Sequence, residues 1–424
     1  MSGQITSNVF RGSGVVAATA GGLNWVSTVV TGSTLTAEAG NGYWINTTSN
    51  TCTITLPSSA SAGDQIVFID YARTWGTYKI IIDSNGLNYQ GEDDTFTVEY
   101  DTDGETLNIV YVDATKGWIP LNDDDVTDAP VAPTTKKAIF AYGLNQSNVD
   151  VSMSNLVNSS GVVASDVTGV GTARDRLAAA TYGGDKGIFG YGGTSTEVSM
   201  TNLVNNSGVI ATDTTGVGTV RQGIGASTYG VDKAIFAFGT TPTTAISNLV
   251  SNSGVVASDT SGVGTARYGL AATGYGGDKA IFAYGYVSSS VSMSNLVSNA
   301  GVVATDVTGV GTIRYECGAA GYGVGLGIFA YGYDTGAPAV ISVSNKVSYV
   351  GVIASDTTGV GSARHGVAAA SYGGDKAIFG FGNIWPNKQG MTNLVSNTGV
   401  VASDVSAVGT VRFAPGACGY SFST

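Results

Sequence analysis

The chain has 424 residues, enough for two domains with hydrophobic cores of their own. Only 12% of the residues are charged and 62 are Gly, so the composition favours a turn-rich, all-β protein. The net charge of −12 argues against a nucleic-acid-binding surface, and three scattered cysteines argue against a disulfide framework or a zinc site.

Residues 1–40 are rich in Gly, Ser, Thr and Ala, with isolated apolar residues such as Phe10 and Trp25. Such a segment buries too little apolar surface to fold alone. We expect an extended attachment arm that orders against a partner. The beginning of the sequence does not have the pattern of a signal peptide, and no apolar run approaches the ~18 residues that span a bilayer.

Residues 41–121 contain short alternating runs that predict strands, separated by turn sequences such as Asp-Ser-Asn-Gly at 83–86. The predicted strands are residues 52–56, 65–70, 78–83, 95–100, 106–112 and 117–120. This pattern predicts a β-sandwich or jelly-roll-like module. Residues 122–136 are acidic and contain two Pro, so we expect a semi-stiff linker, and a metal site there is the weaker alternative.

Residues 137–424 contain six copies of one sequence repeat. The hexapeptide Ala-Ile-Phe-Ala-Tyr-Gly and its variants begin at residues 138, 187, 234, 280, 327 and 377. A fixed period of roughly 46–50 residues is typical of a repeat architecture. Each copy continues with an Asn-Leu-Val-like run, Gly-Val-Val or Gly-Val-Ile, an Asp, a Gly-Val-Gly turn, an Arg, and a run of small residues that ends in Tyr-Gly.

Each copy predicts four short strands and no helix; in one copy these are residues 270–275, 279–284, 291–298 and 301–306. Four strands per ~45 residues are typical of a β-propeller blade, and a stack of parallel β-helix coils is the alternative. The small-residue run suits the innermost strand, where room is least. The first copy lacks this run and the chain ends with a spare one after Arg412. We therefore predict a six-bladed propeller whose C-terminal strand pairs beside residues 137–143 and closes the ring.

The run of Arg, small residues, Tyr-Gly-Gly-Asp-Lys and Ile-Phe-Ala-Tyr-Gly resembles the kelch-type repeat over about two-thirds of the chain. It departs from the kelch pattern because most copies have one Gly of the Gly-Gly pair and none has the Trp at the end of the blade. Near-identical repeats behind a Thr/Ser/Gly-rich β module also resemble bacteriophage tail-fibre and other virion surface proteins. The resemblance implies a virion structural protein that forms a homo-oligomer, with a trimer favoured.

Six of the nine Arg occupy one repeat position, each about eight residues after an Asp. A ring of Arg that binds an anion is one interpretation. The favoured one is structural, with each Arg bonded to the Gly-Val-Gly loop and to its own Asp, because a catalytic site needs one asymmetric constellation. The pairs are Asp166/Arg174, Asp213/Arg221, Asp259/Arg267, Asp306/Arg314, Asp356/Arg364 and Asp404/Arg412.

Enzyme chemistry finds little support in the repeats. Glu197 and Glu316 are their only Glu and His365 their only His, and no arrangement typical of a glycosidase or hydrolase is present. We expect no catalytic residues, no metal and no cofactor. A polysaccharide-degrading enzyme is the least favoured alternative.

The copies differ mainly between their second and third strands, and strand alternation places these loops on one face. Variable loops on a rigid scaffold are typical recognition elements. Trp385 lies in one of them, residues 383–390, beside amides and a Lys, which suits stacking on a sugar, and packing against the blade is the alternative. The candidate ligand-binding residues are Trp385, Asn387, Lys388, Tyr286, Tyr333, Asp334 and Glu197.

These observations predict a non-enzymatic protein of the virion surface. The arm and the module are expected to attach it to other virion proteins, and the propeller is expected to contact a host-surface glycan or protein. Neither nucleic acid nor membrane insertion is expected. The alternative is a capsid decoration or tail component whose propeller contacts only other virion proteins.

Overall fold

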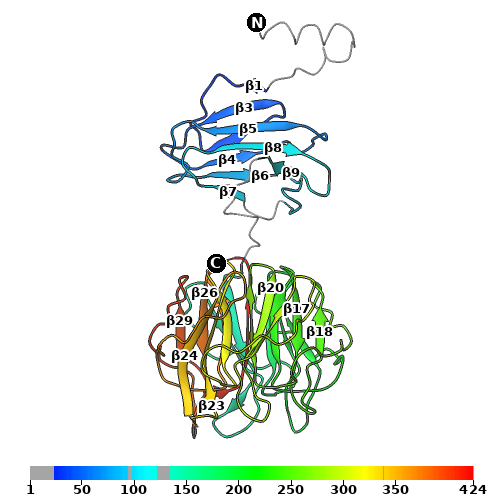
Figure 1. Ribbon diagram of the computed structural model, residues 1–424. Helices are drawn as coiled ribbons and strands as arrows, with labels where there is room; N and C mark the ends of the chain where they lie inside the picture. Colours follow the sequence, from blue (N-terminus) through cyan, green and yellow to red (C-terminus); the bar gives the residue numbers. More distant parts are fainter. Residues whose placement is uncertain (1–22, 94–97, 122–133, 338, 424) are drawn as a thin grey trace. The chain divides into compact units, whose positions relative to one another are not determined.

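The computed structural model describes residues 23–93, 98–121, 134–337 and 339–423. Every regular element among these residues is a strand, so the prediction of an all-β chain is confirmed. The chain divides into two compact units, Met1–Pro133 and Thr134–Thr424 (Figure 1). Within the described residues, no helix is long and apolar enough to cross a membrane. Most of the expected linker and residues 1–22 of the expected arm lie outside the described residues.

The first unit consists of two sheets around one core. One sheet has the order β1 (Asn24–Trp25), β3 (Asn41–Ile45), β5 (Gln65–Asp70), β8 (Thr106–Tyr111) and β9 (Trp118–Pro120). The other has the order β2 (Thr34–Thr36), β4 (Cys52–Thr55), β6 (Ile80–Asp83) and β7 (Val98–Tyr100). Strands β1 and β2 fall within residues 1–40, so part of the expected arm belongs to the folded module. The core includes the fully buried Trp75 and Trp118.

The pairing within these sheets differs from a jelly roll. Strands β1, β3 and β5 pair in parallel, as do β2, β4 and β6. Strands β1 to β6 alternate between the two sheets, so this part of the chain winds around the core, whereas β6 and β7, and β8 and β9, pair antiparallel within one sheet. A jelly roll is antiparallel. The prediction of two layers agrees with the structure, whereas the jelly-roll topology is wrong for β1 to β6.

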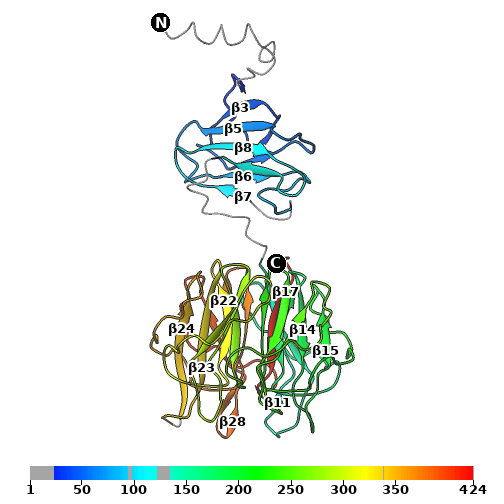
Figure 2. The same cartoon turned by 45° about the vertical axis from the view of Figure 1, so that its right-hand side comes forward.

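The second unit contains six three-stranded antiparallel sheets in its described part (Figures 1 and 2). They are β31–β10–β12, β13–β14–β15, β16–β17–β18, β19–β20–β21, β22–β23–β24 and β25–β26–β29. Their first strands are β31 (Gly416–Tyr420), β13 (Ala178–Tyr182), β16 (Gly225–Tyr229), β19 (Ala271–Tyr275), β22 (Gly318–Tyr322) and β25 (Ala368–Tyr372). Their middle strands are β10 (Lys137–Ala141), β14 (Lys186–Gly190), β17 (Lys233–Ala237), β20 (Lys279–Ala283), β23 (Leu326–Asp334) and β26 (Lys376–Gly380). Their third strands are β12 (Ser154–Val157), β15 (Thr201–Val204), β18 (Ser247–Val250), β21 (Ser294–Val297), β24 (Ala339–Val347) and β29 (Thr392–Val395).

The expected fourth strand is not a regular strand. In the copy that contains β21, it makes only the isolated bridges Val297↔Val303 and Ser294↔Val307. The two bridges enclose one more residue on the outer segment than on β21, which produces a bulge. The side-chain amide of Asn295 fills the gap by donating to the Ala304 carbonyl at 3.0 Å. The prediction of four regular strands per copy is therefore wrong by one.

The middle strands are buried on both faces, as their continuous apolar sequence predicts. Aromatic side chains join neighbouring sheets edge to face; Tyr191 and Phe236, for example, have ring centroids 5.2 Å apart. Small residues make room for these rings, since a Cβ on Gly190 would lie 2.7 Å from the Phe236 ring.

The small-residue first strands lie side by side in the order β31, β13, β16, β19, β22 and β25, and β25 again contacts β31. The C-terminal strand β31 pairs with β10 in the register Lys137↔Tyr420 to Ala141↔Gly416. The predicted pairing of the C-terminal strand is thus confirmed. A segment from the end of the chain completes the first sheet of the repeats.

Candidate functional site

The repeated Arg is a buried joint between neighbouring sheets. Arg221 is fully buried, and its Nε and Nη1 donate to the carbonyls of Phe238 and Thr219 at 2.8 and 3.0 Å. Its Nη2 donates to Asn248 Oδ1 at 2.6 Å, and its guanidinium lies 4.3 Å from the centre of the Tyr191 ring. The contact with the Asn side chain occurs in all six copies. These side chains lie inside the sheets, so the structure rules out a ring of exposed Arg that binds an anion.

The Asp that serves each Arg comes from the following copy. Arg174 lies 4.0 Å from Asp213 and not beside Asp166, which is eight residues before it. Asp213 also accepts hydrogen bonds from the backbone and hydroxyl of Thr172, in the turn just before Arg174. The expected pairing of each Arg with its own Asp is therefore wrong. The same shift by one copy gives the ion pairs Arg221–Asp259, Arg267–Asp306 and Arg364–Asp404, at 4.0, 3.9 and 3.9 Å.

The pairing expected between Asp306 and Arg314 fails in the same way. Asp306 pairs with Arg267 of the copy before, and Arg314 makes no ion pair with any of the described residues. Arg314 is still fully buried, and its Nη2 and Nη1 donate to Asn345 Oδ1 at 2.7 Å and to the Thr312 carbonyl at 3.1 Å. Its Nε finds no hydrogen-bond partner among the described residues. Arg314 therefore keeps the structural role that was predicted for it, but through an amide and a carbonyl instead of its own Asp.

The shift has one cause in all copies. The Gly-Val-Gly turn leads the chain away from the Asp of its own copy and toward the next sheet. There the Asp of the next copy accepts hydrogen bonds from the turn. In the copy of Arg314 this Asp is Asp356, which accepts from the backbone and hydroxyl of Thr312 at 3.0 and 2.6 Å. The same hydrogen bond joins the last copy to the first, since the hydroxyl of Thr410 donates to Asp166 at 2.7 Å. Asp404 pairs with Arg364, so the expected pair Asp404/Arg412 is absent as well.

These carboxylates are held in their ionised form. Burial alone would raise the pKa of Asp213, but hydrogen bonds from Thr172 and Asn202 outweigh burial and keep the pKa below its ordinary value of 3.8. The same direction holds for the pKa of the five equivalent residues, Asp166, Asp259, Asp306, Asp356 and Asp404. Six equivalent joints of this kind connect neighbouring sheets, so their role is structural.

The variable loops gather at one end of the sheets. The residue after each Arg pairs with the start of the loop that follows the middle strand, as in Tyr268↔Tyr286, Tyr315↔Tyr333 and His365↔Asn383. Short strands β11 (Leu144–Asn145) and β30 (Arg412–Phe413) make the equivalent pair in the first copy. We call this end the loop face. The chain enters the unit at the opposite end, where Thr135 accepts a hydrogen bond from the Gly374 turn.

Trp385 lies at the tip of a hairpin on the loop face. The hairpin consists of β27 (Asn383–Ile384) and β28 (Asn387–Lys388), and 80% of the Trp385 surface is exposed. Packing of this ring against the blade is therefore ruled out. The neighbouring loop steadies the hairpin, because Lys388 donates to Gln146 from its backbone at 2.8 Å and to Asn148 from Nζ at 2.6 Å.

Two other predicted residues belong to a chain of aromatic rings that the sequence reasoning missed. Tyr286 contacts both Tyr268 and Tyr315, with ring centroids 5.3 Å apart in each case. Tyr333 contacts Tyr315 and also His365, which continues to Phe413. We call Tyr268, Tyr286, Tyr315, Tyr333, His365 and Phe413 the aromatic arc. The signal in the sequence was a residue with an aromatic ring directly after the Arg in four copies: Tyr268, Tyr315, His365 and Phe413.

Glu197 and Asp334 are also on the loop face, but each has a local structural partner. Glu197 accepts from Gln222 Nε2 at 3.1 Å and from Thr241 Oγ1 at 2.9 Å. Asp334 is buried and accepts from the backbone of Gly336 at 2.7 Å. Asp334 therefore shapes its own turn.

A charged cluster at the centre of the loop face was not predicted. Arg176 Nη1 lies 3.0 Å from Asp175 Oδ2, and its Nε lies 3.8 Å from Glu316 Oε1. The other carboxylate oxygen of Glu316 lies 2.7 Å from His365 Nδ1. Burial raises the pKa of Asp175 to about 6, although Arg176 acts to lower it. The cluster combines residues from three copies, so spacing along the chain gave no indication of it.

Comparison with models of known protein families finds no match, and comparison with curated proteins finds none either. Among the described residues, no group of three or more His, Cys, Asp or Glu side chains is placed to hold a metal ion. The candidate site therefore rests on its own chemistry. The loop face offers rings for stacking and charged groups for hydrogen bonding.

Proposed function

We propose that the second unit is a six-bladed β-propeller in which strand β31 closes the ring. The six equivalent sheets, the neighbour relations of their first strands and the pairing of β31 with β10 support this arrangement. The six Arg joints also support it, because Thr410 in the last copy bonds to Asp166 in the first as Thr172 bonds to Asp213. A ring of this kind makes a rigid base for loops.

We propose that the loop face recognises a glycan on a host surface. The observation that carries this proposal is the 80% exposed indole of Trp385, held on a hairpin beside Asn387 and Lys388. An exposed large ring with amides and an ammonium group beside it matches the apolar face and the hydroxyls of a sugar. The neighbouring aromatic arc extends the same chemistry over the face.

The setting proposed for this activity is the surface of a bacteriophage virion, as in a tail fibre. The resemblance of the repeats and of the module to such proteins supports it. The arm and the first unit would attach the chain, as a homo-oligomer, to other virion proteins. No enzymatic step is proposed.

The test is a glycan array with the full chain, its Trp385→Ala variant and a matched control, Tyr349→Ala. Tyr349 is 54% exposed and lies in a turn at the opposite end of the sheets. Saturable binding that is lost in Trp385→Ala and kept in Tyr349→Ala is expected. Equal binding by all three proteins, or binding by none, would refute the proposal.

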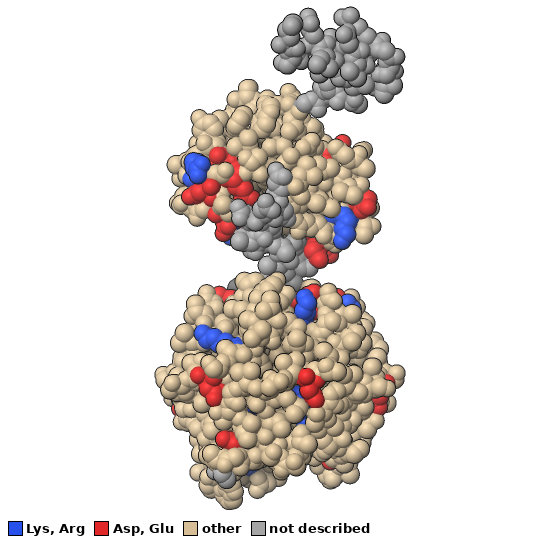
Figure 3. Space-filling model, viewed as in Figure 1, with Lys and Arg blue, Asp and Glu red and all other residues tan. Residues whose placement is uncertain are grey.

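A structural role in the particle is the second candidate, and one surface feature favours it. Each copy exposes an equivalent Val by 61–65% at the turn after its third strand. These residues are Val162, Val209, Val255, Val302, Val352 and Val400. Few charged side chains cover the face of the second unit that Figure 3 draws. Six equivalent apolar contacts suit repeated protein neighbours. Changing Val255 and Val302 to Ser should then reduce incorporation into particles without changing glycan binding.

A further inference from the structure

Six residues form a cycle of backbone hydrogen bonds on the loop face. Each copy contributes the second residue after its repeated Arg. The backbone N–H of this residue donates to the backbone carbonyl of the equivalent residue in the preceding copy. The cycle runs through Arg176, Gly223, Gly269, Glu316, Gly366 and Ala414, with N···O distances of 2.6–3.1 Å. We call it the backbone cycle. All six residues have positive φ, from 49° to 63°.

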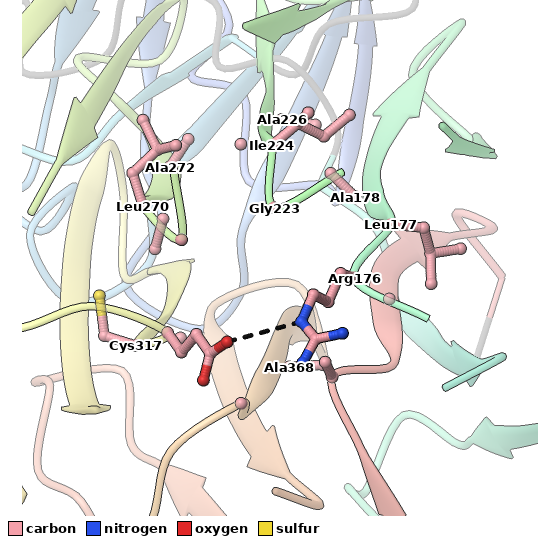
Figure 4. Close-up of a pocket in the computed structure, with 18 of the residues that line it drawn as sticks. Arg176, Leu177, Ala178, Gly223, Ile224, Ala226, Leu270, Ala272, Cys317 and Ala368 are labelled. Carbon is pink, nitrogen blue, oxygen red and sulfur yellow. Dashed lines mark ion pairs between the residues drawn. The ribbon is translucent and has the colours of Figure 1, made fainter. Parts of the chain in front are cut away.

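Positive φ favours Gly, and three members of the backbone cycle are Gly. Arg176 and Glu316 have long side chains at φ 50° and 51°, an arrangement that costs roughly 1 kcal/mol or more at each position. Their side chains meet, with Arg176 Nε 3.8 Å from Glu316 Oε1 (Figure 4). Sheet formation does not require these side chains, because Gly serves the same backbone position in other copies. Strain that the fold does not need points to a function.

This ion pair lies in the wall of a cavity of about 410 Å³. Leu177, Ile224 and Leu270 give its lining apolar side chains, and Gln222, Thr241 and Tyr268 give it polar groups. Its volume falls in the range of roughly 300–1,000 Å³ that is typical of small-molecule sites. The cavity is therefore large enough to hold one sugar residue.

Polar atoms close to this ion pair lack partners. Asp150 Oδ1 and Asn383 Oδ1 are buried and accept no hydrogen bond from the described residues. Asp150 interacts electrostatically with Arg176, and the side chain of Asn383 lies 3.3 Å from His365 Nε2. Buried acceptors without donors are rare in folded proteins. Neither Asp150 nor Asn383 lines the cavity, so these oxygens mark the polar surroundings of the charged cluster and are not contacts of a ligand in the cavity.

We propose that the cavity beside Arg176 and Glu316 binds one uncharged, polyhydroxylated sugar residue. A hydroxyl both donates and accepts, so one hydroxyl of such a ligand can donate to Glu316 and accept from Arg176. The ring of Tyr268 and the side chains of Leu177, Ile224 and Leu270 provide an apolar side. Arg176 itself lies over the ring of Phe413 at 5.3 Å. The inference rests on the proposed glycan recognition and names the sugar class and the central subsite.

The charges around the cavity exclude acidic sugars. Asp150, Asp175 and Glu316 lie around Arg176, so carboxylates outnumber the guanidinium that they surround. A uronic or sialic acid would bring a further negative charge to this group and would be repelled.

Arg176→Gly and Glu316→Gly are the appropriate variants, because Gly occupies this position in three copies and relieves the positive φ. Ala414→Gly is the matched control in the same backbone cycle. Isothermal titration of the full-length protein with glucose, galactose, mannose, N-acetylglucosamine and glucuronic acid measures Kd. We expect an uncharged sugar to bind, each of the first two variants to weaken it at least about tenfold, and the control to change it less than about twofold. The melting temperatures of all three variants should equal or exceed that of the parent.

Each other outcome is decisive. Binding of glucuronic acid alone, or unchanged binding in Arg176→Gly and Glu316→Gly with loss in Trp385→Ala, overturns the central subsite and leaves glycan recognition standing. Absence of binding to these sugars, combined with saturable array binding that needs Trp385, also overturns the central subsite only. Absence of binding in both assays overturns the subsite and the proposed function together.

Discussion

The most direct test of the scaffold is the substitution Asn248→Ala. The side chain of Asn248 is fully buried and makes three hydrogen bonds. It donates to the Ala257 carbonyl at 3.0 Å and to Asp259 Oδ1 at 2.9 Å, and it accepts from Arg221 Nη2 at 2.6 Å. One neutral bond of about 1 kcal/mol and two bonds to charged groups of roughly 1.5–3 kcal/mol each predict a loss of about 4–7 kcal/mol in the free energy of unfolding.

The assay is urea unfolding of the full chain followed by circular dichroism. Asn252→Ala, an exposed Asn of the same copy, is the control and should change the free energy by less than about 0.5 kcal/mol. A double-mutant cycle with Arg221→Met should show a coupling of roughly 0.5–3 kcal/mol, because both changes remove the same bond. If Asn248→Ala costs no more than the control, the buried joint does not hold the sheets together and the reasoning fails.

Three further predictions follow from the same contacts. Deleting residues 412–424 leaves β10 without its partner β31. The melting temperature should therefore fall by more than about 10 °C, and light scattering should rise because an edge strand is exposed. An unchanged melting curve would show that β31 is dispensable. The lowered pKa of Asp213 and its equivalents means that their contribution to stability is present above about pH 4 and is lost as the pH falls through their folded pKa. Asp213→Asn should therefore flatten the decline in unfolding free energy below about pH 4, and an identical pH profile would contradict this. The pKa of Asp175 is raised to about 6, so the folded state loses stability as the pH rises from about 4 to 6. Asp175→Asn should therefore raise the free energy of unfolding at pH 7 by up to roughly 3 kcal/mol. A gain in this free energy that persists at pH 3.5 would refute the electrostatic cause.

Local sequence patterns predicted most of the strands. The Ala-Ile-Phe runs are apolar on both faces and are buried as expected, and the spare small-residue run after Arg412 pairs with β10. Such features depend on residues close in sequence or on a simple count of copies. Trp385 could be selected from the sequence as a candidate because the loop around it differs from the loops of the other copies.

Other features depend on which distant segments meet, and the sequence pattern leaves these open. The alternation in Cys52–Thr55 is the same in a parallel and an antiparallel sheet, so the winding of the first unit was missed. The spacing of Asp306 and Arg314 suggested a local pair, but the turn between them crosses to the next sheet and Asp306 serves the copy before. Arg176 and Glu316 are far apart in sequence, and only their departure from Gly at a repeated position marked them out.

The joint from Thr410 to Asp166 is chemically the same as the joints between consecutive copies. The hydroxyl-to-carboxylate bond therefore does not distinguish the first copy from any other. A circular permutant that opens the chain at the turn Gly276–Gly277 and links the present ends of the second unit should keep the same joints. Copies with different loops should likewise be exchangeable. The arrangement of the loops would then depend on the order of the copies along the chain and not on the sheets that carry them.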